Sequence, residues 1–171
     1  MPADIVARTF DAACLPELAG FDCGPDQFGT IATDWIRCTD PSDCALQAIA
    51  ERQTEVILYS TPGGVLVGYG SLGRTTRRIK KVEEIWSIIP HIGIDHAFRG
   101  CPTGAAWQDR YAATIMVDLM ALAREHGTPT LMLKVHCDNQ PARKLYDRLG
   151  FMPLGGPNAE GYETMIIANH S

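Results

Sequence analysis

Apolar residues follow a helical spacing in the N-terminal part of the chain. Within Gly24–Arg37 they recur every three or four positions, which predicts a helix with one buried face. Pro41 cannot continue that helix but suits the first turn of another, which we expect over Ser42–Glu51. A short strand is expected before them, at Asp4–Phe10. The chain therefore begins with a predicted strand and two helices.

The hydrophobic period then changes to that of strands. Glu55–Ser60 and Val65–Leu72 are rich in β-branched and aromatic residues, and the Thr-Pro-Gly-Gly turn between them predicts a hairpin. The basic segment Arg74–Lys81 is interpreted as a solvated turn between strands. A third extended run, Ile85–Ile94, contains Pro90, which usually marks a strand edge or a bulge.

The C-terminal part alternates helices with strands. Arg110–His126 is the clearest helix, with Asp109 as its expected N-cap and Gly127 as its C-terminal stop. The near-continuous apolar run Thr130–His136 predicts a central strand. Further elements are expected at Pro141–Leu149 (helix, ended by Gly150) and Glu163–Ala168 (strand), and a short strand at Phe151–Leu154 is left open. This order predicts one α/β domain over residues 1–171, with a mixed, largely antiparallel sheet of six to seven strands and about four flanking helices.

Composition narrows the function classes. The 171 residues are 46% hydrophobic and 20% charged, as in an ordinary globular domain. A formal net charge of -5 repels phosphate backbones on average, so nucleic acid is not the expected partner. Six cysteines without a C-x-x-C pair predict free thiols in the cytoplasm and no metal site. Neither a signal peptide nor a membrane-spanning apolar run is evident, so no membrane association is expected.

A strand that runs into a glycine-containing loop and then a helix is the first candidate for chemistry. His91–Gly104 has this arrangement, which makes an anion site because glycine permits close approach and helix-start N–H groups point at the ligand. Arg99 would add a charge-assisted contact to a phosphate. An ordinary strand–helix connection explains the same residues, so this segment alone leaves both interpretations open.

A short helix carries the second candidate. On a helix that begins near Pro141, Ala142 and Tyr146 are four residues apart and share a face. The small Ala142 lets a ligand pass closely, and the Tyr146 phenol can protonate a leaving thiolate. The alternative is that Tyr146 is a core tyrosine and Asn139 a helix cap.

Together, the two segments resemble the GNAT superfamily of N-acetyltransferases over roughly Val56 to Phe151. The resemblance implies the acyl-CoA N-acyltransferase fold, in which the fourth strand opens into a V-shaped gap. It further implies direct transfer of the acetyl group of acetyl-CoA to a primary amine of a small molecule or protein, with Tyr146 protonating the departing thiolate. The second segment matches the family pattern at Asn139, Ala142, Tyr146, Gly150 and Phe151.

The same resemblance assigns residues to parts of the coenzyme. Strand backbone would pair with pantetheine, and the following loop and helix N-terminus would hold the phosphates. The residues so implied are Ile92, Gly93 and Ile94 for pantetheine, Arg99 and Gly100 at the start of the phosphate loop, and Asn139.

The phosphate loop departs from the family pattern. Pro102 stands where the middle glycine is expected, and proline offers no N–H to a phosphate. The distance from Arg99 to Gly127 is also about two helical turns too long. Either the helix begins at Gly104, or Cys101–Asp109 is an inserted loop. In the second alternative, which we favour, the phosphate-binding positions are Arg110, Tyr111 and Ala112.

Other functions are kept as alternatives. Phe21–Gly24, Trp35-Ile36 and Val67–Tyr69 weakly resemble the GNAT toxins that acetylate aminoacyl-tRNA, although the acidic net charge disfavours a tRNA substrate. A non-catalytic acyl-CoA-binding module is the third reading. The amine acceptor and the oligomeric state stay open, with a homodimer through a strand edge as one option. So does the general base, for which the candidates are Glu83, Glu84 and His91.

Overall fold

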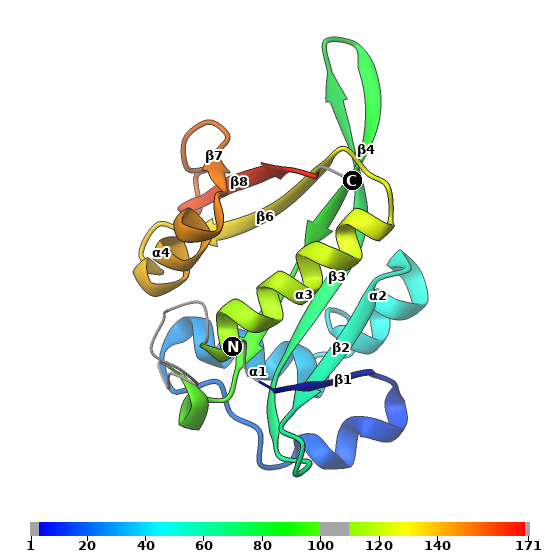
Figure 1. Ribbon diagram of the computed structural model, residues 1–171, viewed down its shortest axis with the longest axis vertical. Helices are drawn as coiled ribbons and strands as arrows, with labels where there is room; N and C mark the ends of the chain where they lie inside the picture. The colour runs from blue at the N-terminus through cyan, green and yellow to red at the C-terminus, as the bar shows by residue number, and fades with distance from the viewer. Residues whose placement is uncertain (1–3, 100–109, 170–171) are drawn as a thin grey trace. The chain divides into compact units, whose positions relative to one another are not determined.

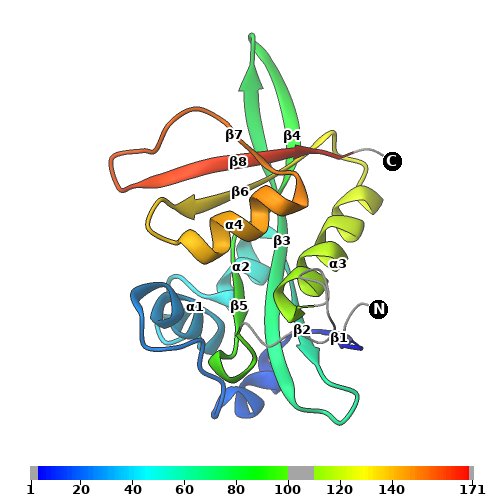
Figure 2. The same cartoon turned by 60° about the vertical axis from the view of Figure 1, so that its left-hand side comes forward.

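One long strand, β3 (Leu66–Ile79), connects two compact units of the chain. The computed structural model describes residues 4–99 and 110–169, shown as coloured ribbon in Figures 1 and 2. The first unit comprises the described residues up to Leu72 and those from His91 to Leu119. The second comprises Gly73–Pro90 and the described residues from Met120 onward.

The first unit holds an antiparallel sheet in which β2 lies between β1 and β3, and β5 pairs with β3. Turn residues and helix caps divide the remaining chain of this unit into short helices, of which two are 3-10 helices, η1 and η2. The strands are β1 (Val6–Thr9), β2 (Glu55–Ser60), the first part of β3 and β5 (Ile92–Ile94). The helices are η1 (Ala12–Leu18), α1 (Gln27–Arg37), α2 (Ala45–Arg52), η2 (His96–Phe98) and the first part of α3 (Tyr111–Glu125).

Alternation along β3 places α1 and α3 on opposite faces of this sheet. The Tyr69 hydroxyl donates to the carbonyl of Ala32 in α1 at 2.8 Å. The next residue, Gly70, faces the other way, and a Cβ there would lie 2.6 Å from Leu119 Cδ1 of α3. Glycine therefore permits α3 to pack directly on the strand, while the tyrosine fixes α1 on the other side.

The core of the first unit is aromatic and aliphatic. Each large side chain that is fully buried there contributes about 1.5–3 kcal/mol relative to exposure. Asp26, a residue type preferred at helix N-caps, begins α1 by accepting hydrogen bonds from the N–H groups of Phe28 and Gly29. The largest members of the core are Phe10, Leu18, Phe21, Trp35, Ile36, Val56, Leu58 and Tyr69.

The second unit contains the only parallel pair among the described strands, β4 with β6, in which Ser87 lies beside Leu131. The other pairs, β3–β4, β6–β8 and β7–β8, are antiparallel. Helix α4 lies next to β8, since Arg143 forms a 2.9 Å ion pair with Glu163 (Figure 2). The elements are Gly73–Ile79 of β3, β4 (Val82–Ile89), the end of α3, β6 (Thr130–His136), α4 (Gln140–Leu149), β7 (Met152–Pro153) and β8 (Tyr162–Ala168).

The predicted fold class is confirmed, with two corrections to the strands. The described strands follow the order β1-β2-β3-β4-β6-β8-β7, with β5 beside β3. They number eight rather than six or seven, because Pro90 divides the expected run Ile85–Ile94 into β4 and β5. The interpretation of Arg74–Lys81 as a turn is wrong, because β3 continues to Ile79 and only Lys80 and Lys81 form the turn.

Helix positions agree closely with the sequence periodicity. Helix α3 ends where expected, with Gly127 at φ 70° and its N–H donated to the Arg124 carbonyl. Helix α4 ends at Gly150, at φ 98°. Within the described residues, no helix is both long and apolar enough to cross a membrane.

Candidate functional site

Strand β5 presents an open edge to a ligand. The His91 carbonyl accepts the N–H of Ser71 at 2.9 Å, and β3 also accepts the N–H of Asp95, so the odd-numbered residues face β3. Because backbone groups alternate along a strand, the N–H and C=O groups of Ile92 and Ile94 point to the other edge. None of the strands that the structure describes pairs with that edge. It can therefore bind an extended chain that carries amide groups.

A buried serine holds the backbone where β5 begins. Ser71 is fully buried, and its hydroxyl accepts the His91 N–H and donates to the His91 carbonyl, each at 2.9 Å. The His91 ring is stacked on Trp35, with ring centroids 4.2 Å apart and planes 20° apart. These contacts fix the start of β5 next to the Pro90 break. They also place His91, a candidate general base, flat against an indole.

Position 93 requires a glycine, because neighbouring side chains leave no room for a Cβ atom. A Cβ at this position would lie 2.5 Å from Tyr69 Cε1 and 2.9 Å from the sulfur of Cys23. Tyr69 and Cys23 are both fully buried. Burial raises the pKa of the Cys23 thiol to about 11, so this group is neutral at physiological pH and serves packing.

Arg99, predicted to contact a phosphate, is bound to Asp26. Its Nη1 lies 3.0 Å from Asp26 Oδ2, and the two side chains are about half exposed. The pKa of Asp26 is lowered, first by the N–H of Gly29 that it accepts and then by the Arg99 guanidinium. The predicted positions Gly100 and Gly104, with Pro102 and the Asp109 cap, lie outside the described residues.

Helix α3 begins at Tyr111, as the insertion alternative expects. Arg110 precedes the helix, and its carbonyl accepts the N–H of Thr114 at 3.0 Å. Residues 104–109, over which the other alternative would extend the helix, lie outside the described residues. The rings of Phe98 and Tyr111, which flank residues 100–109 in the sequence, are in contact, with centroids 5.4 Å apart. The helix start at Arg110, Tyr111 and Ala112 has the orientation that favours an anion.

In the second unit, α4 carries the predicted proton donor. Tyr146 is 6% exposed, and its ring packs against Phe151 with centroids 5.9 Å apart. Burial raises its pKa to about 12, so the phenol stays protonated at physiological pH. Asn139 stands at the N-cap position, but its side chain makes no capping hydrogen bond. Its side chain therefore has no structural role as a cap.

The residues just before α4 form a cluster that sequence spacing did not reveal. Potential ligand atoms of His136, Cys137 and Asp138 lie within 4.8 Å of one another, with the Cys137 sulfur 4.0 Å from His136 Nδ1. However, His136 Nδ1 accepts the N–H of Asp138 at 3.1 Å, and Nε2 lies 3.0 Å from the Glu160 carbonyl. Both ring nitrogens thus have backbone partners, and the cluster is explained as a loop contact rather than a metal site.

The glutamate candidates for the general base lie on β4. Glu84 Oε2 accepts the indole N–H of Trp86 at 2.9 Å, which gives this carboxylate a structural role. Glu83 is exposed and lies opposite Arg78 in the strand register. Neither contact identifies a base.

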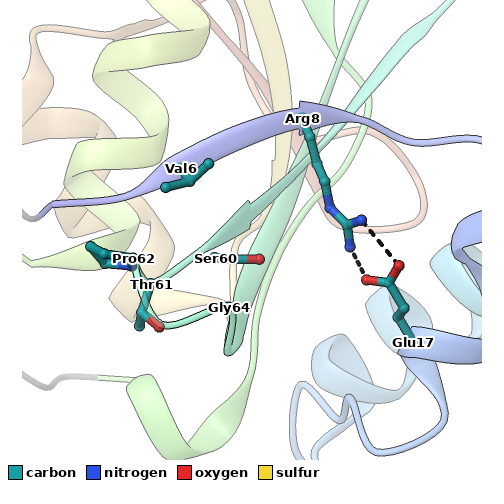
Figure 3. A pocket seen from close by; sticks show the side chains of 7 residues that line it. All are labelled: Val6, Arg8, Glu17, Ser60, Thr61, Pro62 and Gly64. Atoms are coloured by element: carbon teal, nitrogen blue, oxygen red, sulfur yellow. Dashed lines mark hydrogen bonds and ion pairs between the residues drawn. The ribbon is translucent and has the colours of Figure 1, made fainter.

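A surface cavity of about 280 Å³ lies elsewhere in the first unit (Figure 3). The Arg8 guanidinium and the Glu17 carboxylate form an ion pair at one side of it. None of the residues predicted to bind the coenzyme line it. Its lining is Val6, Arg8, Glu17, Ser60, Thr61, Pro62 and Gly64.

Comparison with known proteins identifies the domain type. The family model for the acetyltransferase (GNAT) family matches residues 26–151. The chain is similar to the toxin AtaT, in the structure of a tyrosine-to-phenylalanine mutant with the C-terminus of its antitoxin AtaR and acetyl-CoA. The TM-score is 0.69 at 17% identity, over 97% of this chain and 94% of that one.

Two further structures share the fold. The ribosomal-protein-S18-alanine N-acetyltransferase from Escherichia coli matches with a TM-score of 0.61 at 16% identity, over 98% of this chain and 95% of that one. The KacTA–DNA complex matches with a TM-score of 0.64 at 17% identity, over 97% and 94%. No curated protein sequence matches significantly.

Proposed function

Because the chain belongs to the acetyltransferase (GNAT) family, we propose that it transfers the acetyl group of acetyl-CoA directly to a primary amine. The acceptor in this proposal is a small molecule or a protein. The observation that carries the proposal is the open edge of β5, where the backbone groups of Ile92 and Ile94 have no strand partner among the described residues. The similarity to a toxin structure that contains acetyl-CoA supports the choice of donor.

Pantetheine is chemically suited to that edge. It is an extended chain with two amide groups, which can bond to a strand as a further strand does. The proposed phosphate positions are Arg110, Tyr111 and Ala112, since the start of α3 offers N–H groups and a partial positive charge. Asn139 is proposed as a further coenzyme contact, because its amide is not used to cap α4.

Tyr146 is the proposed donor to the leaving sulfur. As the amine nitrogen bonds to the carbonyl carbon, the carbon–sulfur bond breaks and the sulfur takes the electron pair. With a pKa of about 12, Tyr146 is a weaker acid than an ordinary thiol, whose pKa is about 8.5. The phenol therefore acts mainly by donating a hydrogen bond to the developing thiolate, and the proton released by the amine restores neutrality.

The test distinguishes the contribution of the β5 backbone to acetyl-CoA binding from that of the β5 side chains. Ile92→Pro removes the N–H that points to the open edge, whereas Ile92→Ala trims the side chain and keeps that N–H. One hydrogen bond contributes about 0.5–1.5 kcal/mol, so acetyl-CoA should bind about 2- to 12-fold more weakly to the proline variant than to the alanine variant. Isothermal titration calorimetry measures both, with melting curves to confirm folding. Equal affinities in two folded variants would contradict the proposed role of the edge.

Toxin-type acetylation of aminoacyl-tRNA is the second candidate. It is favoured by the similarity of the chain to AtaT across nearly its full length. Supplying charged tRNA and free amines in parallel to the same enzyme distinguishes the two acceptors. Acetylation of the aminoacyl group alone would select the second candidate. A protein that binds acetyl-CoA but acetylates neither would instead be a binding module.

A further inference from the structure

The second unit contains a two-stranded arm, which we define as residues 74–86 of β3 and β4 with the turn between them. Pairing of β3 with β2 ends at Leu72, and β4 pairs with β6 only from Ser87 onward. Among the described strands, the arm therefore has no third partner. Figures 1 and 2 show it in green, extending beyond β6 and β8 of the same unit.

The arm is basic in an acidic protein. It holds five basic and two acidic side chains, a formal charge of +3, while the whole chain carries -5. The rest of the chain therefore carries -8. The net charge of the whole chain, which argued against nucleic acid as a partner, averages the basic arm with the acidic remainder. The five basic residues are Arg74, Arg77, Arg78, Lys80 and Lys81.

One face of the arm is used for packing. The Arg77 guanidinium lies over the ring of Trp86, 5.5 Å from its centroid, and Glu84 accepts the indole N–H. These contacts stabilise a ribbon that would be marginal by itself. On the opposite face, Arg74 and Arg78 are exposed, and Ile85 between them is 55% exposed. Glu83 lies on the same face, opposite Arg78, and neither arginine has a hydrogen bond or ion pair within the described part of the chain.

The lysines in the turn are unfavourable for folding. Ile79 pairs with Val82, which leaves a two-residue turn with Lys80 at φ 48° and Lys81 at φ 69°. Two positive φ values define a type I′ turn, for which Asn-Gly is preferred. A non-glycine residue in this region costs roughly 1–2 kcal/mol. Turn geometry thus does not account for two lysines at the tip, whereas a need for charge does.

We propose that the exposed face and tip of the arm bind the phosphodiester backbone of a nucleic acid. Arg74 and Arg78 are four residues apart on one strand, which separates them by about 14 Å. A two-stranded ribbon fits a duplex groove about 12 Å wide, where its cations reach phosphates on both sides. The tip lysines add two charges at the end of the ribbon. This binding is separate from acetyl transfer and requires no acetyl-CoA.

The test uses a variant that removes charge while improving the turn. Lys80→Asn combined with Lys81→Gly creates the preferred type I′ pair, so its melting temperature should equal or exceed that of the wild type. Binding of the full chain to fluorescent deacylated tRNA and to a 20-base-pair DNA duplex is measured by anisotropy between 50 and 200 mM salt. Four phosphate contacts predict a slope of log K against log salt of about -3.6 on duplex DNA.

The double variant should lose about half of that slope and on the order of 100-fold in affinity at 50 mM salt. Arg124→Gln with Lys134→Gln is the matched control, because both residues are exposed and lie outside the arm. This control should bind like the wild type. Binding to tRNA alone, to DNA alone or to both supports the proposal and identifies the source of the phosphates. Equal loss in both double variants, or no binding of the wild type to either nucleic acid, overturns it.

Discussion

Gly93→Ala should destabilise the first unit through one defined overlap. The new Cβ would lie 2.5 Å from Tyr69 Cε1, whereas ordinary contacts begin near 3.4 Å, so the ring must move by almost 1 Å. It is poorly able to do so. Tyr69 is fully buried, is hydrogen-bonded to the Ala32 carbonyl at 2.8 Å and is stacked on Trp35. The same Cβ meets the Cys23 sulfur at 2.9 Å.

Overpacking of this kind costs about 1–3 kcal/mol. Because the Tyr69 ring can hardly move, we expect Gly93→Ala to cost close to the upper value. At roughly 2–4 °C per kcal/mol for a chain of this size, the melting temperature should fall by about 6–12 °C. Gly20→Ala is the control, since nothing lies within 4 Å of its Cβ and its φ is ordinary. Calorimetric melting of both variants measures the difference. An unchanged melting temperature in Gly93→Ala would refute this account of the glycine.

Three further predictions concern the site and its surroundings. Tyr146→Phe should lower turnover about 100-fold or more while acetyl-CoA still binds, and Tyr162→Phe should change neither, as a thiol-release assay with calorimetry would show; full turnover by Tyr146→Phe would exclude the donor role. Ser71→Ala and Ser87→Ala each remove a buried, hydrogen-bonded hydroxyl, so each should lower the free energy of unfolding, measured in urea, by about 1–3 kcal/mol. Only Ser71→Ala should also weaken acetyl-CoA binding, because Ser71 fixes the start of β5. Burial raises the pKa of Cys23 to about 11 and that of Tyr146 to about 12, so the unfolded chain loses these protons at lower pH than the folded chain. The free energy of unfolding should therefore fall as pH rises from about 9 to 12. Equal free energies of unfolding in urea titrations at pH 8 and pH 10.5 would contradict the burial argument.

Local patterns in the sequence were sufficient for most helices and strands. The strand expected at Thr130–His136 has those bounds, and the helix-ending glycines at 127 and 150 adopt positive φ. The face shared by Ala142 and Tyr146 also follows from helical spacing, and Tyr146 is the buried residue of that helix. These features depend on neighbours within a few residues, which a single sequence displays.

The arm was misread because it lacks the usual signal of a strand. From Arg74 to Lys81 every residue except Ile79 is polar, so no alternation of apolar and polar positions appears in this part of the arm. The pairing of Arg78 with Glu83 and of Ile79 with Val82 depends on the tight turn at two lysines, a pair that rarely occupies such turns. A charged two-stranded ribbon therefore looks like a loop in the sequence.

Contacts between distant residues were also beyond local patterns. The ion pair of Arg99 with Asp26 joins positions 73 residues apart, and the resemblance to a phosphate loop gave no sign of it. The Tyr69 ring that requires a glycine at position 93 is another case. In contrast, the proline at position 102 and the excess length before Gly127 did indicate the late start of α3 at Tyr111.

The most direct test of the central claim is acetyl-CoA-dependent thiol release by the full chain, measured across amino acids, polyamines, aminoglycosides, peptides and charged tRNA. We expect release that requires both the enzyme and one class of amine, with the acetylated amine identified by mass spectrometry. Tyr146→Phe should abolish most of that release. Failure of the folded protein to bind acetyl-CoA in calorimetry, with no release above background for any amine, would contradict the account.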